Sequence, residues 1–114
     1  MRNRIIAGCL LATAMAALPA ISLAAAPEDN EKFALNCLAC HGAGLEGVDG
    51  LGVSLTDSAF VGRKSVEELV VFLKVGRMPG DIDSVSGRPM PGFSWLPEAD
   101  LAEIAAYIKS RHGS

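Results

Sequence analysis

The sequence has few aromatic residues, no excess of positive charge and no long run of alternating apolar and polar residues. Its 114 residues include four Phe, one Tyr and one Trp, and the formal net charge is −3 at pH 7. An acidic chain is poorly suited to bind phosphate groups, which excludes nucleic acid as a natural partner. The missing alternation gives no basis for a sheet and indicates an all-α protein. A small core with few aromatic side chains usually needs a metal, a disulfide or a cofactor.

Charge is also missing from residues 5–26, an uncharged run that follows Arg2 and Arg4. A basic start, an apolar run and a final group of small residues are the three parts of a secretory signal peptide. We therefore predict that residues 1–26 are removed on export to a bacterial periplasm. An uncleaved membrane anchor formed by residues 5–26 is the alternative. Residues 27–114 then form one domain with eight basic and thirteen acidic residues, a net charge near −5.

The domain has the hydrophobic periodicity of helices separated by loops. Ser65 and Glu68 have the spacing of a capping box, in which each side chain bonds the other residue's free backbone N–H group. An apolar stripe at helical spacing follows and ends at Gly76. The segment 76–96 is rich in Gly and Pro, and a loop of that length in a small domain is usually functional. Helices are predicted over residues 28–39 and 66–75 and from Pro97 onward, with a short helical turn over 55–60.

Cysteine is scarce: residues 27–114 contain it only at Cys37 and Cys40, and His41 follows directly. Cysteines three residues apart lie on one face of a helical turn. There both thiols can bond the vinyl groups of one haem while the adjacent imidazole binds the iron. A zinc site needs two further ligands, and the only other histidine of the domain is His112. A thioredoxin-like redox pair and a local disulfide are further alternatives. The motif favours attachment of a c-type haem.

Residues 27–114 resemble a class I monohaem cytochrome c over nearly their whole length. The resemblance rests on Phe33, the Cys37–His41 motif, the Met-Pro-Gly-Phe segment 90–93 and the apolar pattern of residues 101–108. It implies an all-α cytochrome c fold with three to four helices around one covalently bound haem. It also implies that Phe33 and Tyr107 lie near the crossing of the first and last helices.

This chain departs from the family pattern at two positions. Asp29 stands where the family often has a glycine one turn before the aromatic residue, which leaves the geometry of the helix crossing open. Val53 takes the place of a proline whose carbonyl orients the proximal histidine. Because any residue supplies a carbonyl, we expect the hydrogen bond to His41 to be retained.

Iron bound by one histidine needs a second axial ligand, and a methionine sulfur raises the reduction potential. Met78 and Met90 are the methionines of the domain, and either could instead be a loop residue packed on apolar neighbours. Met90 is favoured because Pro89 and Pro91 restrict its backbone, and because it matches the ligand position of the family. Met78 is the alternative, as is His112, although the last residues of a chain tend to fray.

Further side chains can be proposed to surround the haem. Most apolar residues of a small domain simply pack in its core, and most charged residues lie solvated on its surface. Apolar candidates for the haem pocket are Leu55, Leu69, Leu73, Phe93, Trp95 and Leu101. Candidates to pair with the haem propionates are Arg63, Arg77, Arg88 and Trp95. The sequence gives no ground for choosing among these four.

These features predict a carrier of single electrons outside the cytoplasm, and not an enzyme. Two strong axial ligands leave no open position on iron, and the sequence has no Ser-His-Asp set and no Gly-rich phosphate loop. The acidic balance predicts weak, salt-sensitive docking to a basic face of a redox partner such as a dehydrogenase, reductase or terminal oxidase. The alternatives are a cytochrome subunit held in such a complex, a haem-based redox or gas sensor, and a thiol–disulfide exchange protein.

Overall fold

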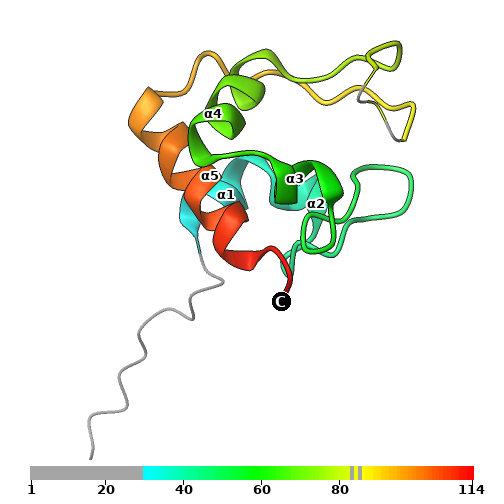
Figure 1. Ribbon diagram of the computed structural model, residues 1–114, viewed down its shortest axis with the longest axis horizontal. Helices are drawn as coiled ribbons and strands as arrows, with labels where there is room; N and C mark the ends of the chain where they lie inside the picture. Colours follow the sequence, from blue (N-terminus) through cyan, green and yellow to red (C-terminus); the bar gives the residue numbers. More distant parts are fainter. Residues whose placement is uncertain (1–29, 83, 85) are drawn as a thin grey trace, which may run out of the picture.

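Five short helices form the described part of the chain, which comprises residues 30–82, 84 and 86–114 of this computed structural model (Figure 1). The predicted signal peptide or anchor, and Asp29, lie outside the described residues. No strand is formed within the described ranges, and none of their helices is long and apolar enough to cross a bilayer. The all-α prediction is therefore confirmed. The helices are α1 (Glu31–Asn36), α2 (Leu38–His41), α3 (Ala59–Arg63), α4 (Val66–Val75) and α5 (Glu98–Arg111).

The first predicted helix is divided into two at Cys37. Helix α1 begins after Asn30, whose side chain accepts a hydrogen bond from the Phe33 N–H at 2.9 Å. Cys37 leaves the helical conformation, with φ −126° and ψ −29°, but its carbonyl accepts the His41 N–H at 2.9 Å. The prediction of one continuous helix over residues 28–39 was thus wrong. The break places both cysteines and His41 on a separate turn, which consists of Cys37 and α2.

The short helical turn predicted over residues 55–60 was also placed too early. Helix α3 begins at Ala59 because the side chain of Ser58 accepts the Val61 N–H at 3.2 Å. A serine at this position is a common helix cap, and this signal was present in the sequence. The last helix likewise begins one residue later than predicted, since Pro97 is the residue before its first turn.

The capping box at the start of α4 is confirmed. The Ser65 side chain accepts the Glu68 N–H at 3.1 Å, and the Glu68 carboxylate accepts the Ser65 N–H at 2.8 Å. This hydrogen bond lowers the pKa of Glu68, and Lys64 contributes to the same shift. Because folding lowers the pKa of Glu68, the stability that its ionised carboxylate contributes is fully present above the ordinary pKa of Glu. This stability is lost as the pH falls through the lowered pKa.

We expect Ser65→Ala to lower the free energy of unfolding by about 1 kcal/mol, because the Glu68 N–H loses its acceptor at the start of the helix. The measurement is chemical denaturation followed by helical circular dichroism. Ser94→Ala is the matched control, since the Ser94 side chain is exposed and has no described hydrogen bond, and its effect should stay within about 0.5 kcal/mol. Equal effects of the two substitutions would contradict the capping assignment.

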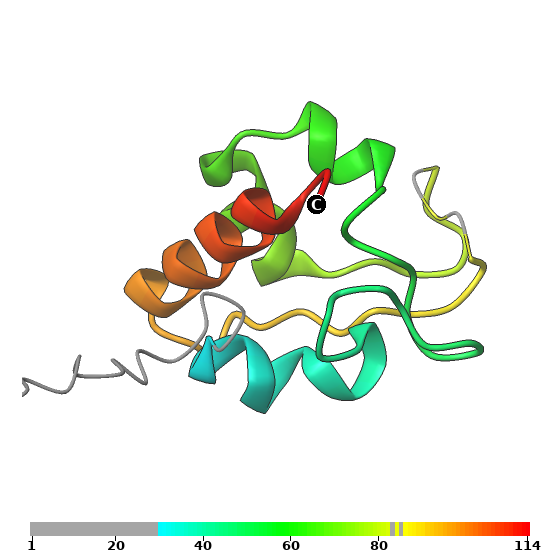
Figure 2. The same cartoon turned by 90° about the horizontal axis from the view of Figure 1, so that it is seen from below.

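The first and last of the described helices, α1 and α5, pack against each other (Figure 2). Phe33 and Tyr107 are both buried there, with ring centroids 5.3 Å apart and planes at 61°, the edge-to-face arrangement that aromatic rings prefer. Lys32 of α1 also forms salt bridges to Asp100 and Glu103 of α5. The predicted helix crossing beside Phe33 and Tyr107 is confirmed, and it places the turn with the two cysteines next to the core.

Candidate functional site

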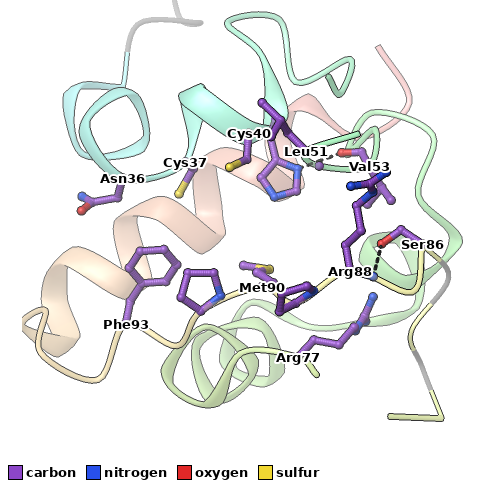
Figure 3. Close-up of a pocket in the computed structure, with 14 residues that line it drawn as sticks. Asn36, Cys37, Cys40, Leu51, Val53, Arg77, Ser86, Arg88, Met90 and Phe93 are labelled. Atoms are coloured by element: carbon purple, nitrogen blue, oxygen red, sulfur yellow. Dashed lines mark hydrogen bonds between the residues drawn. The ribbon is translucent and has the colours of Figure 1, made fainter. Parts of the chain in front are cut away.

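A hollow lies between helix α2, the loop that follows it and the segment that leads to α5. It consists of two adjoining parts of about 630 and 540 Å³, including space open to solvent. Cys37, His41, Val53, Arg77 and Met90 line both parts, which we call the central hollow. Figure 3 shows the cysteine side chains on one side of this hollow and Met90 on the opposite side. Residues far apart in the sequence therefore present three sulfur atoms and an imidazole to one space.

The His41 imidazole is buried and its orientation is fixed by the backbone. His41 is 8% exposed, and its Nδ1 lies 2.8 Å from the Val53 carbonyl oxygen. A carbonyl can only accept, so Nδ1 carries the proton and Nε2 has a free lone pair for a metal. The expected hydrogen bond from His41 to Val53 is therefore confirmed, although valine has replaced proline.

Gly52 brings this carbonyl close to the histidine, a contribution that the sequence analysis missed. A Cβ atom at Gly52 would lie 2.4 Å from the Cys40 carbonyl oxygen and 3.1 Å from His41 Nδ1. The loop can approach α2 this closely only because residue 52 has no side chain. Several glycines in residues 42–52 were the available signal, but their spacing does not say which of them faces the helix.

The two thiols differ in environment. Both are free, but Cys37 is buried and Cys40 is exposed. Burial raises the pKa of the Cys37 thiol to about 11, and the neighbouring Cys40 adds to the increase. Thiol–disulfide exchange requires an accessible thiol with a lowered pKa, because the thiolate is the nucleophile. Cys37 has the opposite properties.

Met90 is held in place by backbone hydrogen bonds to the residues that follow α4. The Arg77 N–H bonds the Met90 carbonyl at 2.8 Å, and the Met90 N–H bonds the Arg77 carbonyl at 2.7 Å. Three residues further on, the Phe93 N–H bonds the Leu73 carbonyl at 2.7 Å. Figure 1 shows the two sides of the 76–96 loop running next to each other. The backbone of Met90 is therefore fixed independently of any bound group.

The two alternative ligands lie elsewhere. The Met78 side chain is 61% exposed, and its backbone N–H bonds the Asp81 carboxylate at 2.8 Å. His112 Nε2 lies 2.9 Å from the Ser58 carbonyl oxygen. Neither residue lines the central hollow. The structure thus brings Met90 together with Cys37, Cys40 and His41, and it leaves Met78 and His112 outside.

The other side chains proposed for the haem pocket divide into two groups. Four of the six apolar candidates line the central hollow, namely Leu55, Leu69, Leu73 and Phe93. Trp95 was wrongly predicted as a lining residue or a propionate partner, because it is 69% exposed and does not border the hollow. Leu101 is buried in the helical core instead. Phe60 and Phe72 also line the hollow, from α3 and α4, and were not predicted. Phe72 follows Leu69 at helical spacing, and that was the available signal.

The arginines proposed as propionate partners differ in whether they line the central hollow. Arg77 and Arg88 line the central hollow, whereas Arg63 is exposed at the end of α3 and does not border it. Arg77 lies against the rings of Phe60 and Phe72, with its guanidinium carbon 4.5 and 4.9 Å from their centroids. Its Nε and one terminal nitrogen are buried and have no hydrogen-bond partner.

Comparison with known proteins gives one family. The sequence model of the family described as "Cytochrome c" matches residues 30–112. A cbb3-type cytochrome c oxidase subunit, FixP, from Azorhizobium caulinodans is 32% identical over 82% of this chain and 31% of its own length. A cbb3-type cytochrome c oxidase subunit, CcoP, from Rhodobacter capsulatus is 28% identical over 79% of this chain and 30% of its own length. The chain therefore spans about a third of the length of these relatives.

No solved structure matches the chain at a comparable level of significance. The family model nevertheless covers nearly all of the described residues, including the Cys37–His41 turn, both sides of the 76–96 loop and the last helix. The small all-α fold agrees with this match. The chain belongs to the cytochrome c family, whose members transfer electrons through covalently bound haem.

Proposed function

We propose that residues 27–114 carry one c-type haem, bound covalently at Cys37 and Cys40 and ligated by His41 and Met90, and that they pass single electrons between redox proteins outside the cytoplasm. The observation that carries the proposal is the convergence of two thiols, an oriented imidazole and a thioether on one hollow. Residues 1–26 would direct export as a cleaved signal peptide. When bound, the haem supplies reversible one-electron chemistry at its iron.

The residues of the central hollow fit such a group. The thiols stand at the spacing that the two vinyl groups require, and the lone pair of His41 Nε2 is free because Nδ1 bonds Val53. Apolar side chains line the deeper part, among them Leu69 and Leu73. They would exclude water and so favour the less charged, reduced state of the iron. The buried and unpartnered nitrogens of Arg77 also indicate that an anionic group belongs beside them.

The surroundings of the site favour a carrier over the other classes. Burial and a raised pKa argue against Cys37 as the nucleophile of thiol–disulfide exchange. Iron held by His41 and Met90 has no open position for substrate, so the proposed activity is electron transfer and not catalysis. A gas sensor requires a displaceable Met90, but the backbone of Met90 is fixed by two hydrogen bonds to Arg77. We expect the ferrous protein not to bind carbon monoxide rapidly at neutral pH.

A second candidate function is electron delivery within or to a cbb3-type oxidase complex. The similarity to FixP and CcoP favours it, since both are subunits of such oxidases and are matched over about a third of their length. A freely diffusing carrier would elute as a monomer after gentle membrane solubilisation. A subunit would instead remain with the oxidase in the same experiment.

The proposed function is tested by the intact mass of the protein exported by a host that matures c-type cytochromes. We expect, under denaturing conditions, the mass of the chain from about residue 25–27 plus one haem. The double variant Cys37→Ser with Cys40→Ser is the matched control, and it should carry no covalent haem. A bare wild-type polypeptide with free or disulfide-bonded cysteines would overturn the proposal and favour a thiol-redox protein.

A further inference from the structure

Arg77 is a half-buried cation that lines the central hollow, and no salt bridge within the described residues neutralises it. Its Nε and one terminal nitrogen are shielded from solvent without a hydrogen-bond partner. Asp57 borders an outer hollow together with Arg77, but no ion pair joins the two. Buried N–H groups of a cation without an acceptor are unfavourable, so such groups normally have a hydrogen-bond partner, and an anion is the strongest one.

Aromatic rings hold the guanidinium in a defined place. The Phe60 and Phe72 centroids lie 4.8 Å apart, and the Arg77 guanidinium carbon is within 5 Å of each. Stacking of this kind suits the planar, weakly hydrated arginine side chain and leaves its N–H edge free to bind a carboxylate with two hydrogen bonds. Both rings and Arg77 border the central hollow, so an anion that enters the hollow can reach this edge.

We propose that Arg77 is the counter-ion of a haem propionate, and that Phe60 and Phe72 hold its guanidinium in position for this pairing. The inference rests on the proposed function, because it requires the haem to occupy the central hollow. The inference chooses Arg77 among the three arginines that the sequence analysis proposed as propionate partners. Arg63 is exposed, and Arg88 is also exposed although it borders the hollow. Arg77 also pairs with Met90 through the backbone, which links the charged group to the loop of the distal ligand.

The pairing has a direct consequence for the reduction potential. A propionate near the iron favours the oxidised, more positively charged state, and a cation that neutralises it removes this preference. Arg77→Gln should therefore lower the potential. We expect the equilibrium between reduced and oxidised protein to shift about tenfold toward the oxidised state, which corresponds to about 59 mV for one electron. Arg77→Lys keeps the charge and should shift the equilibrium less than about threefold.

The experiment is a spectroelectrochemical titration of the matured holoprotein and its variants. Arg63→Gln is the matched control, because it makes the same change of charge at an exposed position where solvent screens it, and it should shift the equilibrium less than about threefold. The sulfur-to-iron charge-transfer band is recorded for each variant to show that Met90 is still bound. A shift in Arg77→Gln no larger than that in Arg63→Gln would overturn the inference. So would loss of the band in both Arg77→Gln and Arg77→Lys, since Arg77 would then act on the loop and not on a carboxylate.

A second measurement covers the case in which Arg77→Gln does not mature. Redox-difference infrared spectra of the wild-type holoprotein are compared with and without ¹⁵N-labelled arginine. Guanidinium bands that shift with the label and are missing from Arg77→Lys support the pairing, and spectra that the label leaves unchanged contradict it. A chain that carries no haem at all would contradict the proposed function together with this inference. A haem-bearing chain whose potential ignores Arg77 would contradict the inference alone.

Discussion

Met90→Ala is expected to lower the reduction potential of the holoprotein by on the order of 0.2 V, a part of the roughly 0.8 V range that axial ligands span. The thioether is the feature that would hold the potential high, and Met90 is the methionine that borders the central hollow. Removing it opens one position on iron. The ferrous variant should therefore bind carbon monoxide and lose the sulfur-to-iron charge-transfer band.

Two controls accompany this prediction. Met78→Ala should change neither the potential nor the band, because the Met78 side chain is 61% exposed. His112→Ala should behave in the same way, since the His112 ring bonds the Ser58 carbonyl. If Met90→Ala kept the wild-type potential and either control lost it, the distal ligand would be Met78 or His112, and the proposed ligation would be wrong.

Gly76→Ala is expected to lower the free energy of unfolding by about 2–6 kcal/mol. Gly76 has φ +74° and ψ −160°, a conformation open almost only to glycine, and occupying it with alanine costs about 1–3 kcal/mol. The new Cβ would also lie 2.4 Å from the Met90 carbonyl oxygen and 2.6 Å from the Gly92 nitrogen. Separating these backbones adds a further 1–3 kcal/mol or so. Such a loss is a large fraction of the stability of a small domain.

Chemical denaturation of the matured holoprotein measures this loss, and the charge-transfer band reports whether Met90 stays on the iron. Gly80→Ala is the matched control in the same loop, because a Cβ there would meet nothing within 4 Å and its φ is not positive. It should change the stability by no more than about 1 kcal/mol. Similar unfolding curves for the two variants would show that the contact between Gly76 and the Met90 segment does not stabilise the loop.

Much of the fold follows from short sequence patterns. The capping box fixed the start of α4, and Gly76 fixed its end. The errors arose where two local signals competed. Cys37 leaves the helical conformation although a continuous helix was predicted through it, and α3 begins after Ser58 although a helical turn was predicted from residue 55. Element boundaries depend on single hydrogen bonds, which periodicity does not resolve.

For the candidate site, the sequence by itself determined the attachment motif. Cys37, Cys40 and His41 lie within five residues, so one helical turn is enough to present them together, and no distant contact is needed. Membership of the cytochrome c family agrees with this reading. The overall negative charge likewise led to the expectation, without any structure, that nucleic acid is not a partner.

Only the tertiary structure separated residues that look alike in the chain. Met78 and Met90 both stand beside proline in a Gly-rich loop, yet only Met90 borders the central hollow, because backbone bonds to Arg77 turn its segment inward. Arg63 and Arg77 are equivalent cations in the sequence, yet of the two only Arg77 lies against aromatic rings and has buried nitrogens without a hydrogen-bond partner. Burial and pairing of this kind depend on the path of segments far apart in the chain, and local sequence does not encode that path.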